Sequence, residues 1–145
     1  MCGYLSTIAW NCFFAVSERS FPEAKLIPEV GSHERALVYQ WSVYGPAEME
    51  APLIDSAIFA RTDPERSAKG RKRFDERAEV VAASLGEQDY LLGEQFTVAD
   101  IMVGSALKFT ARIGFADELP ENLRVYMARL QGRPAYERAV ARMSD

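Results

Sequence analysis

Two pairs of side chains that could bind a small molecule have the spacing of neighbours on a helix. Tyr44 and Glu48 are four residues apart, and Phe109 and Arg112 are three apart, so the members of each pair share one face of a helix. A small-molecule site usually combines an apolar wall with a few polar groups. If the two helices line a common cleft, these four residues form a substrate pocket; otherwise the rings belong to the core and the charges to the surface.

The chain contains little else that could carry catalysis. Its single histidine, His33, stands at an expected helix start, and one histidine builds neither a triad nor a histidine-rich metal site. Cys2 and Cys12 lack partners at metal-ligand spacing, and there is no phosphate-binding or dinucleotide glycine motif. We therefore predict no catalytic residue and no metal. The cysteine content fits a reduced, cytoplasmic protein.

A complete helix start occupies residues 96 to 101. Thr97 is expected to cap the helix, Asp100 to reach back to the N–H of Thr97, and Phe96 to pack on Ile101 as a hydrophobic staple. A structural role for Asp100 is favoured over a chemical one, because its charge also complements the helix dipole. Its removal should lower the stability by on the order of 1 kcal/mol, and by more if the helix start is buried, which corresponds to several degrees in melting temperature.

Helical periodicity continues from Ser32 to the end of the chain, without an alternating strand or a hairpin turn signal. The expected fold class is all-α, a helical bundle of about five main helices, with the third one central and buried. Gly104 and Ser105 in this third helix are small enough to let a neighbour approach. The predicted helices cover residues 32–60, 63–85 and 97–113, then one follows Pro120 and one follows Arg133.

The first predicted helix should bend at Gly45-Pro46, because proline removes an N–H and clashes with the preceding turn. Apolar spacing also predicts which residues of the first two helices face the core. These are Leu37, Val38, Trp41, Tyr44 and Met49 in the first, and Phe74, Ala78, Val81 and Leu85 in the second.

Charge and hydropathy exclude two classes of partner. The net charge of −4 provides no positive field for nucleic acid or an anionic membrane. The basic run from Arg66 to Arg73 is followed by Asp75 and Glu76, which predicts a solvated face of ion pairs. The longest nearly apolar run, residues 8–16, is far shorter than the roughly 20 residues of a membrane helix.

Three segments, in order, resemble one known family. Residues 90–101 (YLLGEQFTVADI) are similar to the start of the central helix in the C-terminal domain of cytosolic glutathione S-transferases. Residues 132–139 (GRPAYERA) resemble the start of a late helix of that domain. The stretch from Phe21 to Trp41 resembles its linker and first helix. The resemblance covers about residues 18–143 and implies a helical C-terminal domain over 32–145. Residues 1–31 would be an atypical N-terminal segment and linker, a remnant or replacement of the thioredoxin-like domain.

The resemblance also implies an activity. In this family, glutathione is the cosubstrate, and its thiolate attacks a small hydrophobic electrophile. Tyr44, Glu48, Phe109 and Arg112 carry over, by helix position, to the electrophile pocket. The residue that activates glutathione belongs to the thioredoxin-like domain, so this chain alone is expected to be inactive.

Assembly is the remaining expectation. The family dimerises partly through the helices that correspond to 32–60 and 63–85, which predicts a homo-oligomer. An alternative from another functional class is a non-catalytic helical interaction module, because the same domain resembles those that assemble elongation factor complexes and aminoacyl-tRNA synthetases.

Overall fold

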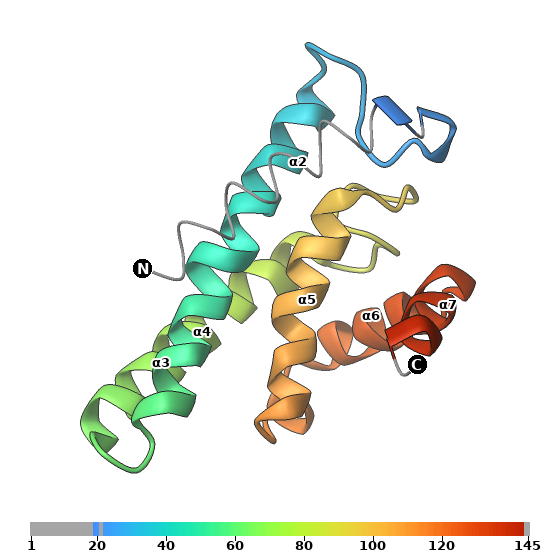
Figure 1. Ribbon diagram of the computed structural model, residues 1–145. Helices are drawn as coiled ribbons and strands as arrows, with labels where there is room; N and C mark the ends of the chain where they lie inside the picture. Colours follow the sequence, from blue (N-terminus) through green and yellow to red (C-terminus); the bar gives the residue numbers. More distant parts are fainter. Residues whose placement is uncertain (1–18, 21, 144–145) are drawn as a thin grey trace.

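The computed structural model describes residues 19–20 and 22–143 (Figure 1). Every named secondary-structure element in these residues is an α-helix, a 3-10 helix or a π-helix. The all-α prediction is confirmed. Cys2 and Cys12 lie outside these residues. No helix in the described part is long and apolar enough to cross a membrane. The elements are η1 (Pro22–Ala24), α2 (His33–Tyr44), η2 (Gly45–Glu50), α3 (Ala51–Phe59), α4 (Pro64–Leu85), α5 (Val98–Arg112), η3 (Ala116–Glu118), α6 (Glu121–Gln131) and α7 (Pro134–Met143).

Helix α2, the segment η2 and helix α3 follow one another without a break, as the predicted single long helix requires. Where the sequence predicted a bend, η2 is a π-helical turn, in which the N–H of Ala51 bonds to the carbonyl of Pro46. Pro46 and Pro52 have no N–H and would clash with carbonyls one turn earlier in a regular α-helix. The wider turn therefore accommodates two prolines in one continuous rod.

Helix α5 is the centre of the molecule, as predicted. Figure 1 shows it between α2 on one side and α6 with α7 on the other, and α5 contacts α2, η2 and α6. Gly104 faces Leu130 of α6, as expected of a small residue, whereas Ser105 is exposed. Gly45 closely approaches the backbone of α5, because a Cβ at this position would lie 2.8 Å from the carbonyl oxygen of Met102. This contact holds the π turn directly against α5.

The predicted core positions of the first two helices are mostly confirmed. Leu37 and Tyr44 are the exceptions, because both are only partly buried. The hydroxyl of Tyr44 donates a hydrogen bond to the backbone oxygen of Arg77, so the side chain extends to the surface of α4. Val38, Trp41 and Met49 are buried in α2 and η2, as are Phe74, Ala78, Val81 and Leu85 in α4.

The basic run of α4 forms the expected ion pairs. Asp63 caps the helix by accepting from the N–H of Arg66. The ion pairs join side chains four positions apart, and on an exposed helix face each contributes only a few tenths of a kcal/mol. They connect Lys69 with Glu65 at 2.8 Å, Arg71 with Asp75 at 2.8 Å and Lys72 with Glu76 at 3.9 Å.

The segment before α2 is attached to the start of α5. The carbonyl of Leu26 accepts from the N–H of Val98 at 3.0 Å, and the side-chain amide of Gln95 donates to the carbonyl of Lys25 at 2.7 Å. Leu26 and Ile27 pack on the core. The predicted division of the chain between residues 31 and 32 stays a prediction.

Candidate functional site

Tyr44 and Glu48 are brought together by a third residue, Arg77 of α4. The Nε of Arg77 donates to Oε2 of Glu48 at 2.9 Å, and the hydroxyl of Tyr44 donates to the backbone oxygen of Arg77 at 3.3 Å. Tyr44 ends α2, Glu48 belongs to the π turn and Arg77 to α4, so three structural elements meet here. We call these three residues the Arg77 cluster.

The Tyr44 hydroxyl is a hydrogen-bond donor in this cluster. Burial raises the pKa of Tyr44 above the ordinary 10.0, the nearby charge of Arg77 opposes that rise, and the charge of Glu48 adds to it. The ring of Tyr44 also packs edge-on against Trp41, with centroids 5.2 Å apart. At neutral pH the cluster therefore presents a protonated phenol beside an ion pair.

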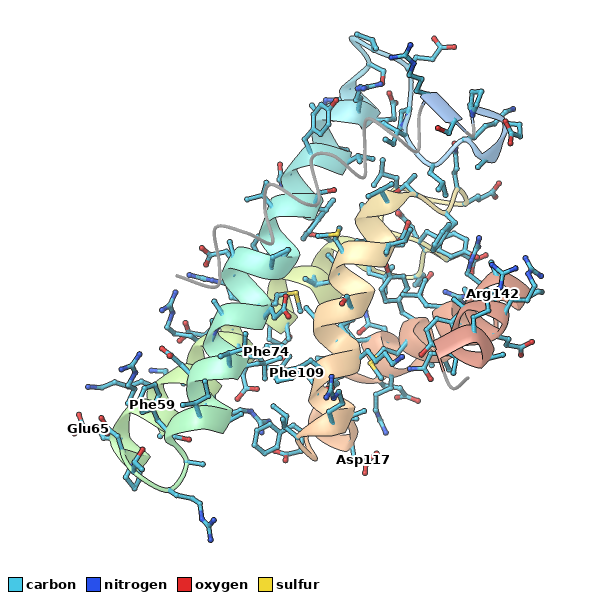
Figure 2. All side chains as sticks on the ribbon, viewed as in Figure 1. Phe59, Glu65, Phe74, Phe109, Asp117 and Arg142 are labelled. Atoms are coloured by element: carbon cyan, nitrogen blue, oxygen red, sulfur yellow. The ribbon has the colours of Figure 1, made fainter. Side chains whose placement is uncertain are left out.

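Phe109 and Arg112 lie on the second half of α5. Phe109 is partly buried against the core, whereas Arg112 is exposed, with its guanidinium carbon 6.0 Å from the ring centroid of Phe109. Figure 2 shows Phe109 on the side of α5 that faces the green helices α3 and α4. Helix α5 packs along α2 and η2, so the two predicted pairs lie on neighbouring helices. Among the described residues, no hydrogen bond, ion pair or ring contact joins one pair to the other.

Sequence reasoning missed Arg77. Its spacing offered a weak signal, because it lies three residues after the buried Phe74 and just before the buried Ala78, at the edge of the apolar face of α4. Nothing in the sequence connects it with Glu48, which is 29 positions away.

Asp100 is fully buried and accepts four hydrogen bonds. Oδ2 accepts from the N–H of Thr97 at 2.7 Å and from its hydroxyl at 3.1 Å. Oδ1 accepts from the N–H of Leu91 at 2.9 Å and from the hydroxyl of Tyr126 at 2.7 Å. The carboxylate thus connects the start of α5 with the preceding loop and with α6. This arrangement is structural, since every acceptor position is occupied by the protein itself.

Phe96 sits under Arg133, whose guanidinium carbon lies 3.4 Å from the ring centroid. Tyr90 packs edge-on against Phe96 at 5.6 Å and accepts a hydrogen bond from Arg133 at 3.3 Å. These contacts join the start of α5 to the start of α7. The expected staple between Phe96 and Ile101, which is partly buried, stays a prediction.

The buried hydroxyl of Tyr126 should make the folded protein less stable at alkaline pH. Burial raises its pKa above the ordinary 10.0, and the charge of Asp100 and the hydrogen bond to it raise it further. The folded protein keeps this proton at a pH where the unfolded chain loses it. The stabilisation is complete below pH 10 and falls by about 1.4 kcal/mol per pH unit above it. Urea unfolding at several pH values between about 10 and 11 should show stability falling more steeply with pH in the wild type than in Tyr126→Phe. Equal slopes would contradict it.

His33 is the exposed first residue of α2, beside Ser32, whose hydroxyl accepts from the N–H of Arg35. Within residues 19–20 and 22–143, no three His, Cys, Asp or Glu side chains are grouped as metal ligands would be. Neither observation adds a reactive group to the Arg77 cluster.

Comparison with known proteins identifies the fold and the family. The family described as "Glutathione S-transferase, C-terminal domain" matches residues 57–129, half of the chain. The chain belongs to this glutathione S-transferase family. A curated relative, glutathione S-transferase GstA of Escherichia coli O157:H7, is 23% identical over 123 residues, which are 84% of this chain and 60% of GstA.

Solved glutathione transferase structures agree with this membership. A ternary complex of BphK, a bacterial glutathione S-transferase, superposes with a TM-score of 0.78 at 25% identity, over 88% of this chain and 64% of BphK. The glutathione transferase URE2P6 of Phanerochaete chrysosporium, solved with oxidized glutathione, gives a TM-score of 0.75 at 18% identity, over 92% of this chain and 65% of that one. The chain thus spans less than two thirds of each of these relatives.

Proposed function

We propose that this chain supplies the electrophile-binding side of a glutathione transferase reaction. The reaction would be nucleophilic attack of the glutathione thiolate on a small hydrophobic electrophile, with glutathione as cosubstrate. Membership of the C-terminal domain family is the observation that carries the proposal. Tyr44 and Glu48, on one helical rod, and Phe109 and Arg112, on the adjacent α5, are the proposed substrate-binding residues.

Activation of the thiol is proposed to come from elsewhere. A thiol reacts as its thiolate, which must be stabilised by a donor or a positive charge near the sulfur. The family resemblance assigns that donor to a thioredoxin-like domain, and we match no residue of 22–143 to it. Residues 32–145 would then form the helical domain that holds the electrophile. We also propose a cytoplasmic location, from the cysteine content.

A conjugation assay tests this division of labour. The 145-residue chain with glutathione and chlorodinitrobenzene should give no turnover above the uncatalysed rate. A chimera that joins the thioredoxin-like domain of an active glutathione transferase to residues 22–145 should turn over, and Phe109→Ala in the chimera should raise KM. Turnover by the chain alone would contradict the division, and a folded but inactive chimera would contradict the proposed function.

Self-association through α2, α3 and α4 is proposed as a second role, and it also suits the alternative of a non-catalytic interaction module. The supporting observation is a set of exposed apolar side chains on these three helices. We expect sedimentation to give a dimer at micromolar concentration and Ile58→Asp to give a monomer. A monomeric wild type would rule this role out. The exposed side chains are Val43, Ile54, Ile58 and Val80.

A further inference from the structure

We propose that Arg77 determines the charge preference of the electrophile pocket: by neutralising Glu48, it makes this wall favour uncharged electrophiles. The inference rests on the proposed function, because it takes Tyr44 and Glu48 as part of that pocket. Arg77 is a specificity-determining residue in this proposal and takes no part in bond making.

The side chains of Arg77 and Glu48 are exposed enough for a ligand to contact them, and their charged groups are close enough for the two charges to cancel. Nε of Arg77 and Oε2 of Glu48 are 2.9 Å apart, and the two side chains are 36% and 39% exposed. In the described part of the chain, Arg77 is the cation that pairs with Glu48. A ligand beside the pair meets almost no net charge, whereas either partner alone would present a full charge.

The backbone around the pair is fixed, so removal of one partner leaves the other in place. Glu48 belongs to the π turn, which packs against both α4 and α5. Gly45, at the start of that turn, lies against the backbone of α5 at Met102. The hydroxyl of Tyr44 binds a backbone atom of Arg77, so that contact does not need the guanidinium.

The two single substitutions should therefore shift ligand preference in opposite directions. Arg77→Met leaves an unpaired carboxylate, which attracts cationic and repels anionic ligands. Glu48→Gln leaves an unpaired guanidinium, which does the reverse. Substitution of a residue with only a structural role would lower the affinity for all ligands alike. The opposite signs are the distinguishing result.

Binding of three nitroaromatic probes to the full chain tests the inference without catalysis. The probes are chlorodinitrobenzene (neutral), chloronitrobenzoate (anionic) and chloronitrobenzyl trimethylammonium (cationic). In a Trp10→Phe background, Trp41 is the remaining tryptophan, and its ring lies 5.2 Å from that of Tyr44. Quenching of its fluorescence gives the Kd of each probe.

Arg77→Met should raise the affinity for the cation relative to the anion about tenfold, and Glu48→Gln should lower this ratio about tenfold. Arg77→Lys keeps the positive charge and should stay near the wild-type ratio. Arg124→Met, on the exposed face of α6, removes the same net charge and should leave the ratio unchanged. If Arg77→Met fails to fold, the inference is tested by Glu48→Gln alone, which must lower the ratio of cation to anion affinity.

Two failures are distinguishable. If Phe109→Ala weakens all three probes but neither Arg77→Met nor Glu48→Gln changes the ratio, the inference is wrong and the pocket stands. The same conclusion follows if Arg124→Met shifts the ratio as much as Arg77→Met. If substitutions at both Phe109 and Tyr44 leave all three Kd values unchanged, the proposed pocket is wrong and the inference falls with it.

Discussion

Asp100→Ala is expected to lower the free energy of unfolding by about 4 kcal/mol, or about 12 °C in melting temperature. The substitution leaves the N–H groups of Leu91 and Thr97 and the hydroxyl of Tyr126 without their acceptor, where the carboxylate is fully buried. Each unsatisfied buried donor costs about 1–3 kcal/mol. Thermal and urea unfolding monitored by circular dichroism measure the loss.

Asp100→Asn is the matched control, because it keeps the volume of the side chain and replaces one acceptor oxygen by a donor. Its amide nitrogen must face either the Thr97 donors or the Leu91 and Tyr126 donors, so it should cost nearly as much as alanine. Tyr126→Phe, which removes only one donor, should cost about 1 kcal/mol. A melting temperature of Asp100→Ala within a degree or two of the wild type would contradict the role assigned to the four hydrogen bonds.

Gly45→Ala is expected to destabilise the protein by about 2 kcal/mol, although alanine is intrinsically about 1 kcal/mol better than glycine in a helix. Its Cβ would lie 2.8 Å from the carbonyl oxygen of Met102 and 3.2 Å from the nitrogen of Val103. These are backbone atoms of the central helix and cannot rotate away. The rod and α5 must therefore separate, which disturbs the core between them.

Gly104→Ala tests the same argument with the opposite expectation. Its Cβ would meet the terminal methyl group of Leu130, 2.5 Å away, which a change of rotamer can move. Urea unfolding should place this variant well above Gly45→Ala in stability. Equal losses would show that steric contact with the α5 backbone is not the cause.

Much of the fold follows from local patterns. The Asp63 cap, the apolar face of α4 and the ion pairs of its basic run depend on residues three or four positions apart, which a helix brings together wherever it lies. The start of α5 is also local, since Thr97 and Asp100 meet within one turn.

The candidate site depends on contacts that no local pattern contains. Sequence spacing paired Tyr44 with Glu48, but only the crossing of α4 over the π turn brings Arg77 to them. Tyr44 was expected in the core and is only partly buried, because its hydroxyl has a partner on another helix. In the same way, Tyr126 reads as an ordinary core residue until α6 places it beside Asp100.

By itself, the sequence determined the helical class, most helix limits and the family, because these depend on the spacing of residues close together in the chain. Only the tertiary structure decided the π turn's contact with α5, the four-fold bonding of Asp100 and the Arg77 cluster. The contact of Gly45 with Met102, the bond from Tyr126 to Asp100 and the ion pair of Arg77 with Glu48 each join residues more than 20 positions apart. Their meeting depends on how whole helices cross, which short-range spacing does not specify.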